Sequence, residues 1–116
     1  PGHHLATGFK ENVAVGSYSN ITCLSPRGSQ LWYELMSKDI MEALKIEKLI
    51  LQFLYQCILP FSNSGYCDPA LDKFLAAVGG WVQIGTRLRW PYRGIDENEI
   101  AHVRKIAKKY CPNFLI

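Results

Sequence analysis

The stretch Asn12-Val13-Ala14-Val15-Gly16-Ser17-Tyr18 decides how the fold of this chain is interpreted. Its centre, Val13 to Val15, is short and apolar, and polar residues and a glycine flank it. A short apolar run with such flanks is typical of a strand that is buried on both faces of a parallel sheet. A run of this length is also compatible with a buried helical segment. We predict a buried strand here.

Two helices are predicted after this stretch. Ser25-Pro26 combines a capping side chain with a proline suited to the first helical position, which predicts a helix over residues 26–36. Asp39 is the expected cap of a second helix over residues 40–59, which we expect Pro60 to end. The second half of the long helix is apolar on more than one face, so it requires cover on nearly all sides. Few elements of a 116-residue chain are free to provide that cover, which indicates that packing partners are missing.

The C-terminal half predicts two more helices. Asp68-Pro69 repeats the pairing of a cap with a proline and predicts a helix over residues 69–78, with Gly79-Gly80 as its left-handed end. Residues 81–93 are predicted to be an extended connection. The last helix is predicted to start at Asp96 with a capping box completed by Glu99, and to stop at Pro112. Residues 1–10 show no periodicity and are predicted to be a loop.

The composition is that of a globular domain. Hydrophobic residues make up 48% of the chain, charged residues 20%, and the net charge is +3. These values exclude a disordered or fibrous chain, and 116 residues suffice for one domain at most. No apolar run reaches the length of about 18 residues that a membrane helix needs. Because the first residue is Pro1, we expect the chain to be processed or to be part of a longer polypeptide.

The four cysteines suggest a reducing compartment. None forms a C-x-x-C pair, and their spacing matches no zinc or redox motif; they are Cys23, Cys57, Cys67 and Cys111. No signal peptide directs the chain to an oxidising compartment, so we expect free, buried thiols and a cytoplasmic location.

Basic and aromatic residues concentrate near the C-terminus. The basic residues are Arg87, Arg89, Arg93, Arg104, Lys105, Lys108 and Lys109. With Trp90 and Tyr92 among them, they suit stacking and phosphate contacts with nucleic acid. Acidic residues at Asp96, Glu97 and Glu99 in the same stretch favour a solvated surface with Trp90 packed beneath it. We therefore expect neither a nucleic-acid nor a membrane partner.

The order of these elements, together with several motifs, resembles the dihydrodipicolinate synthase/N-acetylneuraminate lyase family. Residues 13–21 are similar to that family's eighth barrel strand, which often has the pattern G-x-I-G-S-x-x-N-x, and Pro26 stands where the eighth helix opens. The segment Arg87-Leu88-Arg89-Trp90-Pro91 resembles the R-x-P that precedes the family's terminal helix. Asp68-Pro69-Ala70-Leu71-Asp72-Lys73 resembles the start of an earlier helix in the C-terminal extension. The resemblance covers residues 8–115.

This resemblance implies an α/β fold of the (β/α)8-barrel type. Residues 1–37 would be the last strand and helix of the barrel, and residues 38–116 a helical extension, so that the chain itself is mostly α. A whole barrel takes about 250 residues. The strands that carry the family's Schiff-base lysine and relay tyrosine have no counterpart here, so we assign no catalytic residue. Lys10 is a poor substitute, because the adjacent carboxylate of Glu11 does not depress an amine's pKa.

The resemblance also points to substrate-binding residues. Gly16 and Ser17 fall where the eighth strand reaches the catalytic end of the barrel, and Gly2 falls near the end of the seventh strand. A close-packed strand end would equally require small residues at Gly16 and Ser17. His3 and His4 are more typical of a solvated terminus than of a metal site, because His102 lies on a distant helix. We predict no metal and no cofactor.

The implied function is part of a lyase or aldolase that acts on pyruvate or another 2-keto acid through a lysine imine. This chain alone is expected to form no imine. We also expect it to be part of a homo-oligomer or to need a complementing chain. The alternative is a non-catalytic helical module for binding or oligomerisation. Dye binding and aggregation would indicate an incomplete fragment, whereas a monodisperse, cooperative chain would indicate an independent module.

Overall fold

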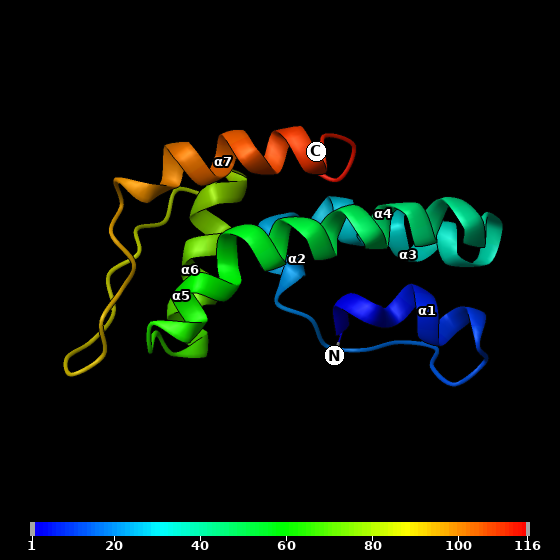
Figure 1. The fold of residues 1–116 in the computed structure, drawn as a ribbon, viewed down its shortest axis with the longest axis horizontal. Coiled ribbons are helices and arrows are strands. Elements are labelled where there is room, and N and C mark those ends of the chain that lie inside the picture. Colours follow the sequence, from blue (N-terminus) through cyan, green and yellow to red (C-terminus); the bar gives the residue numbers. More distant parts are fainter. Residues whose placement is uncertain (1, 116) are drawn as a thin grey trace.

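The structure is a computed structural model that describes residues 2–115, and every regular element in that range is helical. Figure 1 shows α3 and α4 lying side by side, with α1 on one side of them and α7 on the other, and a long loop that projects before α7. The elements are η1 (Gly2–His4), α1 (Leu5–Lys10), α2 (Ile21–Leu24), α3 (Pro26–Lys38), α4 (Ile40–Phe53), η2 (Leu54–Ile58), α5 (Leu59–Asn63), α6 (Asp68–Gly79) and α7 (Glu99–Tyr110).

The predicted α/β barrel class is wrong for the described chain, because residues 2–115 contain no strand. The expected strand at Val13 to Val15 is an irregular segment between α1 and α2 instead. Val13 and Val15 leave 79% and 80% of their surface exposed. A buried parallel strand needs neighbours that pair its backbone and cover its side chains. None of the described elements provides such a neighbour.

One hydrophobic core unites the helices. It includes Leu5 of α1, Trp32 of α3, Phe53 of α4 and Phe74 of α6. The indole Nε1 of Trp32 donates a hydrogen bond of 3.0 Å to the carbonyl oxygen of Ala43, which joins α3 to α4. The core therefore extends across the position between residues 37 and 38 at which we predicted a domain boundary.

Two predicted helix starts are confirmed. The Ser25 hydroxyl accepts a hydrogen bond from the Gly28 N–H, and the Asp39 carboxylate accepts one from the Glu42 N–H. The left-handed Gly80, with φ of 73°, confirms the predicted end of α6. Serine and aspartate caps each replace a hydrogen bond that the first helical turn lacks.

Two other predicted caps are wrong. Cys67 rather than Asp68 is the N-cap residue of α6, and Asp68 lies within the first turn. The capping box from Asp96 to Glu99 does not form, because α7 begins at Glu99 itself. The Asp96 carboxylate accepts instead from the N–H of Asn98, in a turn ahead of the helix. The Asp68-Pro69 pair and the Asp96–Glu99 spacing thus identified where these two helices lie, but not the residue at which each begins.

Pro60 does not end the long helix. Its missing N–H cannot bond to the carbonyl of Gln56, and its ring would press on that carbonyl in a regular α-helix. The chain widens into the π-turn η2 just before it, where the Leu59 N–H donates to the Leu54 carbonyl. Helical structure then resumes as α5, with Pro60 in the first turn. A wider turn is one of the known ways to pass an interruption in the helical ladder.

The N-terminal segment is helical, although we predicted a loop over residues 1–10; Pro1 lies outside the described residues. Leu5 and Ala6 are buried, and α1 packs against α4. The Glu47 carboxylate of α4 accepts hydrogen bonds from both the backbone N–H, at 3.1 Å, and the hydroxyl of Thr7. A six-residue helix is not stable alone, so contacts made 40 positions away in sequence hold it.

Candidate substrate pocket

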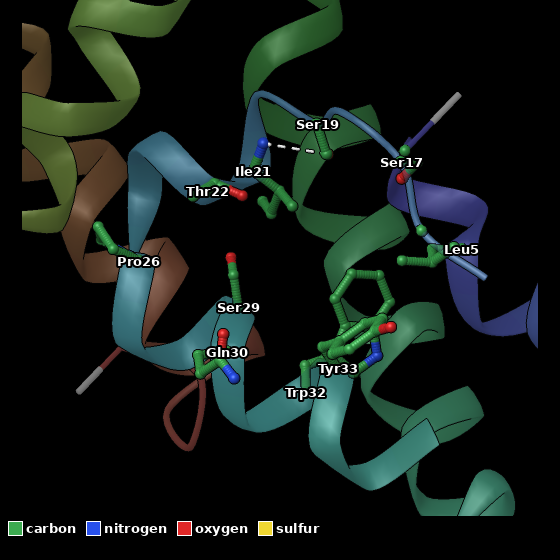
Figure 2. A pocket seen from close by; sticks show the side chains of 12 residues that line it. Leu5, Ser17, Ser19, Ile21, Thr22, Pro26, Ser29, Gln30, Trp32 and Tyr33 are labelled. Atoms are coloured by element: carbon green, nitrogen blue, oxygen red, sulfur yellow. Dashed lines mark hydrogen bonds between the residues drawn. The ribbon is translucent and has the colours of Figure 1, made fainter. Parts of the chain in front are cut away.

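A small cavity of about 230 Å³ lies between η1, the segment before α2, and α3. Figure 2 shows side chains around it from α1, from the segment before α2, from α2 and from α3. The twelve described lining residues are Gly2, Leu5, Gly16, Ser17, Ser19, Ile21, Thr22, Pro26, Ser29, Gln30, Trp32 and Tyr33. Leu5, Ile21 and Trp32 are buried and form an apolar base. The remainder of the lining is mostly small and polar.

All three residues that we predicted as substrate-binding line this one cavity: Gly2, Gly16 and Ser17. The structure therefore brings together positions that are separated by up to fifteen residues in the sequence. The absence of a side chain at Gly2 makes this possible. A Cβ there would lie 2.2 Å from the Tyr18 carbonyl oxygen and 2.4 Å from the Ser19 Cβ. Only glycine lets η1 approach the segment before α2 so closely.

Packing does not require a glycine at position 16. A Cβ at this position would meet no atom within 4 Å. The alternative explanation for Gly16 and Ser17, a close-packed strand end, is therefore wrong for this structure, since both residues are exposed in an irregular segment. The backbone N–H groups of Gly16, Ser17 and Tyr18 donate to no acceptor within the described residues. They are free to donate to a ligand.

Hydroxyl groups add to the donors around the cavity. Figure 2 shows the Thr22 and Ser29 hydroxyls directed toward the space between α2 and α3. The Ser29 Oγ is buried and makes no hydrogen bond within residues 2–115. Buried polar atoms are rarely left unpaired, and such an atom often marks a place for a water or a ligand. The Tyr33 hydroxyl donates at 2.8 Å to the Val15 carbonyl, which fixes the segment before α2 over α3.

The cavity is electrically neutral. None of its twelve described lining residues carries a formal charge. Neutral donors can bind carbonyl, hydroxyl or carboxylate oxygens, but they do not supply an acid, a base or an imine-forming amine. The arrangement therefore suits recognition of a small oxygen-rich molecule. A catalytic acid, base or imine-forming amine would have to come from residues outside this lining.

Sequence reasoning missed Thr22, Ser29 and Tyr33. Ser29 and Tyr33 are four residues apart on α3, so they lie on one face of the helix that we predicted over residues 26–36. This spacing was a usable signal. Thr22 could not be found in the same way, because α2 has four residues and too little periodicity to be predicted.

The remaining predicted positions lie outside the cavity. Lys10 ends α1 on the surface, and His3 and His4 are adjacent rings 4.7 Å apart. Burial, then the neighbouring His4, lowers the pKa of His3. Within residues 2–115 no three histidine, cysteine, aspartate or glutamate side chains gather as a metal site would require. The cysteines are free, with Cys57 and Cys111 buried and Cys23 and Cys67 partly buried.

Comparison with protein-family models, curated proteins and solved structures finds no match to this chain. The described helices include none that is long and apolar enough to cross a membrane.

Proposed function

We propose that this chain serves a lyase or aldolase acting on pyruvate or another 2-keto acid, of the dihydrodipicolinate synthase/N-acetylneuraminate lyase type. In this proposal it binds the substrate through Gly2, Gly16 and Ser17. The observation that supports it best is that these three residues, to which the resemblance pointed, line one cavity. The imine-forming lysine would come from polypeptide outside these 116 residues.

The chemistry of the cavity suits such a substrate. A 2-keto acid presents three oxygens on adjacent carbons, and each accepts hydrogen bonds. The unpaired N–H groups of Gly16 and Ser17 and the unpaired hydroxyl of Ser29 are the matching donors. A carboxylate bound by neutral donors gains from charge-assisted hydrogen bonds. The methyl group of pyruvate would contact the apolar base.

A direct test measures pyruvate binding by calorimetry. We expect the Ser29→Ala variant, which removes the unpaired hydroxyl, to bind pyruvate about tenfold to a hundredfold more weakly, because one hydrogen bond to a charged group contributes about 1.5–3 kcal/mol. The matched control is Ser37→Ala, whose hydroxyl donates to the Glu34 carbonyl and does not line the cavity. Its affinity should equal that of the wild type. Equal affinities of all three proteins would overturn the assignment of the Ser29 hydroxyl as a ligand donor.

Imine formation is tested separately. Borohydride treatment with labelled pyruvate should leave this chain unlabelled, because Lys10 lies beside Glu11 and away from the cavity lining. Covalent labelling of Lys10 or any other lysine would contradict the proposal that the reactive amine comes from elsewhere.

A second candidate function is a non-catalytic helical module that binds another polypeptide. It is favoured by large apolar side chains that remain exposed, among them Met41 and Tyr55 on the long helix. Exposed apolar patches on a small domain commonly mark interaction sites. For either function we propose a cytoplasmic location, which the four free cysteines support.

A further inference from the structure

The loop before α7 forms a basic arm, defined here as residues 82–95. It contains three arginines and no acidic residue. The Tyr92 N–H donates at 3.0 Å to the Arg89 carbonyl, which closes a turn with Trp90 and Pro91 at its apex. Trp90 leaves 92% of its surface exposed, so the prediction that it packs beneath a solvated surface is wrong. The acidic residues that weighed against a binding role lie outside the arm, at its base.

Several contacts hold the arm in place. The Lys73 ammonium of α6 donates at 2.6 Å to the Arg87 carbonyl, and the Arg93 guanidinium stacks over the Tyr66 ring at 4.5 Å. The two sides of the arm are joined where the buried Thr86 hydroxyl donates to the Ile95 carbonyl. Figure 1 shows the arm as the yellow loop that projects from the helices. It therefore presents Trp90 on a braced support, which limits the entropy lost on binding.

The same molecule carries an apolar groove with a volume of about 550 Å³. Its apolar lining comes from the end of α4, the π-turn, the start of α5 and α6: Leu51, Leu54, Tyr55, Ile58, Leu59 and Leu71. Tyr55 is 75% exposed within it. The wider turn of η2 contributes Leu54, Tyr55 and Ile58, so Pro60 shapes this surface indirectly. Such π-turns occur frequently at functional sites.

Charges around the groove oppose those of the arm. Asp68 lines the groove, and Asp72 lies one helical turn further along α6. Burial, then the charge of Asp68, raises the pKa of Asp72. Neither carboxylate forms an ion pair within residues 2–115, and the same holds for Arg87 and Arg89. His3 and His4 also line the groove. Burial lowers the pKa of His3, which favours its neutral form.

We propose that the arm of one copy docks in the apolar groove of a second copy, with Trp90 in the groove and Arg89 beside Asp68. This inference deepens the second candidate function, on which it rests. One chain carries both a projecting apolar residue and a complementary pocket, and this combination produces head-to-tail association between identical molecules. Tryptophan, tyrosine and arginine are the residues that most often dominate the energy of an interface. Opposite charges beside the pocket fix the orientation of the contact.

Sedimentation velocity over a concentration series tests this contact. We expect Trp90→Ala to raise the dissociation constant of self-association at least tenfold, equal to about 1.4 kcal/mol. Because Trp90 is exposed, the variant should fold normally, which circular dichroism would verify. The matched control is Tyr18→Ala, which removes another fully exposed aromatic side chain outside both surfaces. Its self-association should equal that of the wild type.

A charge exchange tests the orientation. Arg89→Asp and Asp68→Arg should each weaken association, and the double variant should restore it toward the wild-type value. A double variant no better than either single variant would overturn the pairing of Arg89 with Asp68. A chain that associates regardless of Trp90→Ala would overturn the docking of the arm while leaving an oligomerisation module in place.

A wild-type chain that stays monomeric at all concentrations would overturn the second copy as partner. Binding of a hydrophobic dye by that monomer would then show that the module's exposed surface persists, which separates the two failures. Binding of the whole chain to acidic lipid vesicles or to a single-stranded oligonucleotide through the arm, without self-association, would likewise overturn the inference.

Discussion

Glu47 is a buried carboxylate whose hydrogen-bond partners both belong to Thr7. Removing it in Glu47→Ala leaves a backbone N–H and a hydroxyl of α1 without their acceptor. We expect the free energy of unfolding to fall by about 1–3 kcal/mol, as for other buried groups that lose their partner. Urea denaturation measures this change.

The control for Glu47 is Glu42→Ala on the same helix. Glu42 is exposed and forms an ion pair with Lys45 at 3.7 Å, a contact that contributes little in water. Its loss should cost less than about 1 kcal/mol. Equal effects of the two substitutions would contradict the role of Glu47 in holding α1.

Gly28 tests close packing at the start of α3. Alanine normally stabilises a helix relative to glycine by about 1 kcal/mol. An alanine Cβ at position 28 would lie 1.8 Å from the Phe114 carbonyl oxygen, so we expect the opposite sign and a loss of about 1–3 kcal/mol. Gly16→Ala, which meets no atom within 4 Å, should change stability by less than about 1 kcal/mol. A stabilising Gly28→Ala in thermal unfolding would refute this packing.

The buried thiol of Cys111 makes the free energy of unfolding depend on pH in the alkaline range. Burial, then the nearby Cys57, raises the pKa of Cys111 from 9.0 to about 12. Between these values the unfolded state loses a proton that the folded state keeps, so stability falls as pH rises, by up to about 1.4 kcal/mol per unit. This contribution is fully present below the unfolded pKa. Urea titrations near pH 8 and near pH 10 should show a smaller decrease in Cys111→Ala than in the wild type; equal decreases would exclude Cys111 as a source.

Some single-residue roles could be predicted from the sequence and others could not. Ser25 and Asp39 cap their helices as predicted because capping depends on atoms within three positions in the sequence. Glu47 and Gly28 could not be predicted, since their partners lie 40 and 86 positions away. Trp90 was predicted wrongly for the same reason: its burial depends on what the rest of the chain places over it.

At the scale of elements, α7 is joined to α6 through Arg104. Its Nε donates at 2.8 Å to the Val78 carbonyl, and its guanidinium donates at 2.7 Å to the Ala77 carbonyl. These acceptors belong to the last turn of α6, where carbonyls lack helical partners. We expect Arg104→Lys to lower stability by about 1 kcal/mol or more, because lysine cannot supply both donors in this geometry. Lys105→Ala, on an exposed neighbour, should have little effect, and equal losses in urea denaturation would contradict the bridge.

The predicted elements were right where periodicity was long and wrong where it was short. The helices at residues 26–36 and 69–78 correspond to α3 and α6 within two residues at each end. The three-residue run from Val13 to Val15 carried no periodicity, and a local apolar pattern cannot reveal whether a pairing strand exists. α1 and α2 have six and four residues and are held by tertiary contacts, so sequence signals for them were weak.

At the scale of the whole molecule, the resemblance suggested a barrel end, and the described chain is a helical domain with one core. The resemblance nevertheless pointed to Gly2, Gly16 and Ser17 as substrate-binding, and these three residues line one cavity. Thr22 and Ser29 also line that cavity, but their part in it could be recognised only from the positions of α2 and α3 in the structure. Met41 and Tyr55 of the long helix and Trp90 of the basic arm remain exposed.

The central claim is that this cavity recognises a 2-keto acid. Its most direct test is a titration of the ¹⁵N-labelled chain with pyruvate, followed through backbone amide resonances. We predict saturable shifts that are largest at Gly16, Ser17 and Tyr18, and shifts that are smaller at the same pyruvate concentration in the Ser29→Ala variant. Resonances of these residues that stay unchanged while pyruvate reaches high millimolar concentration would contradict the claim.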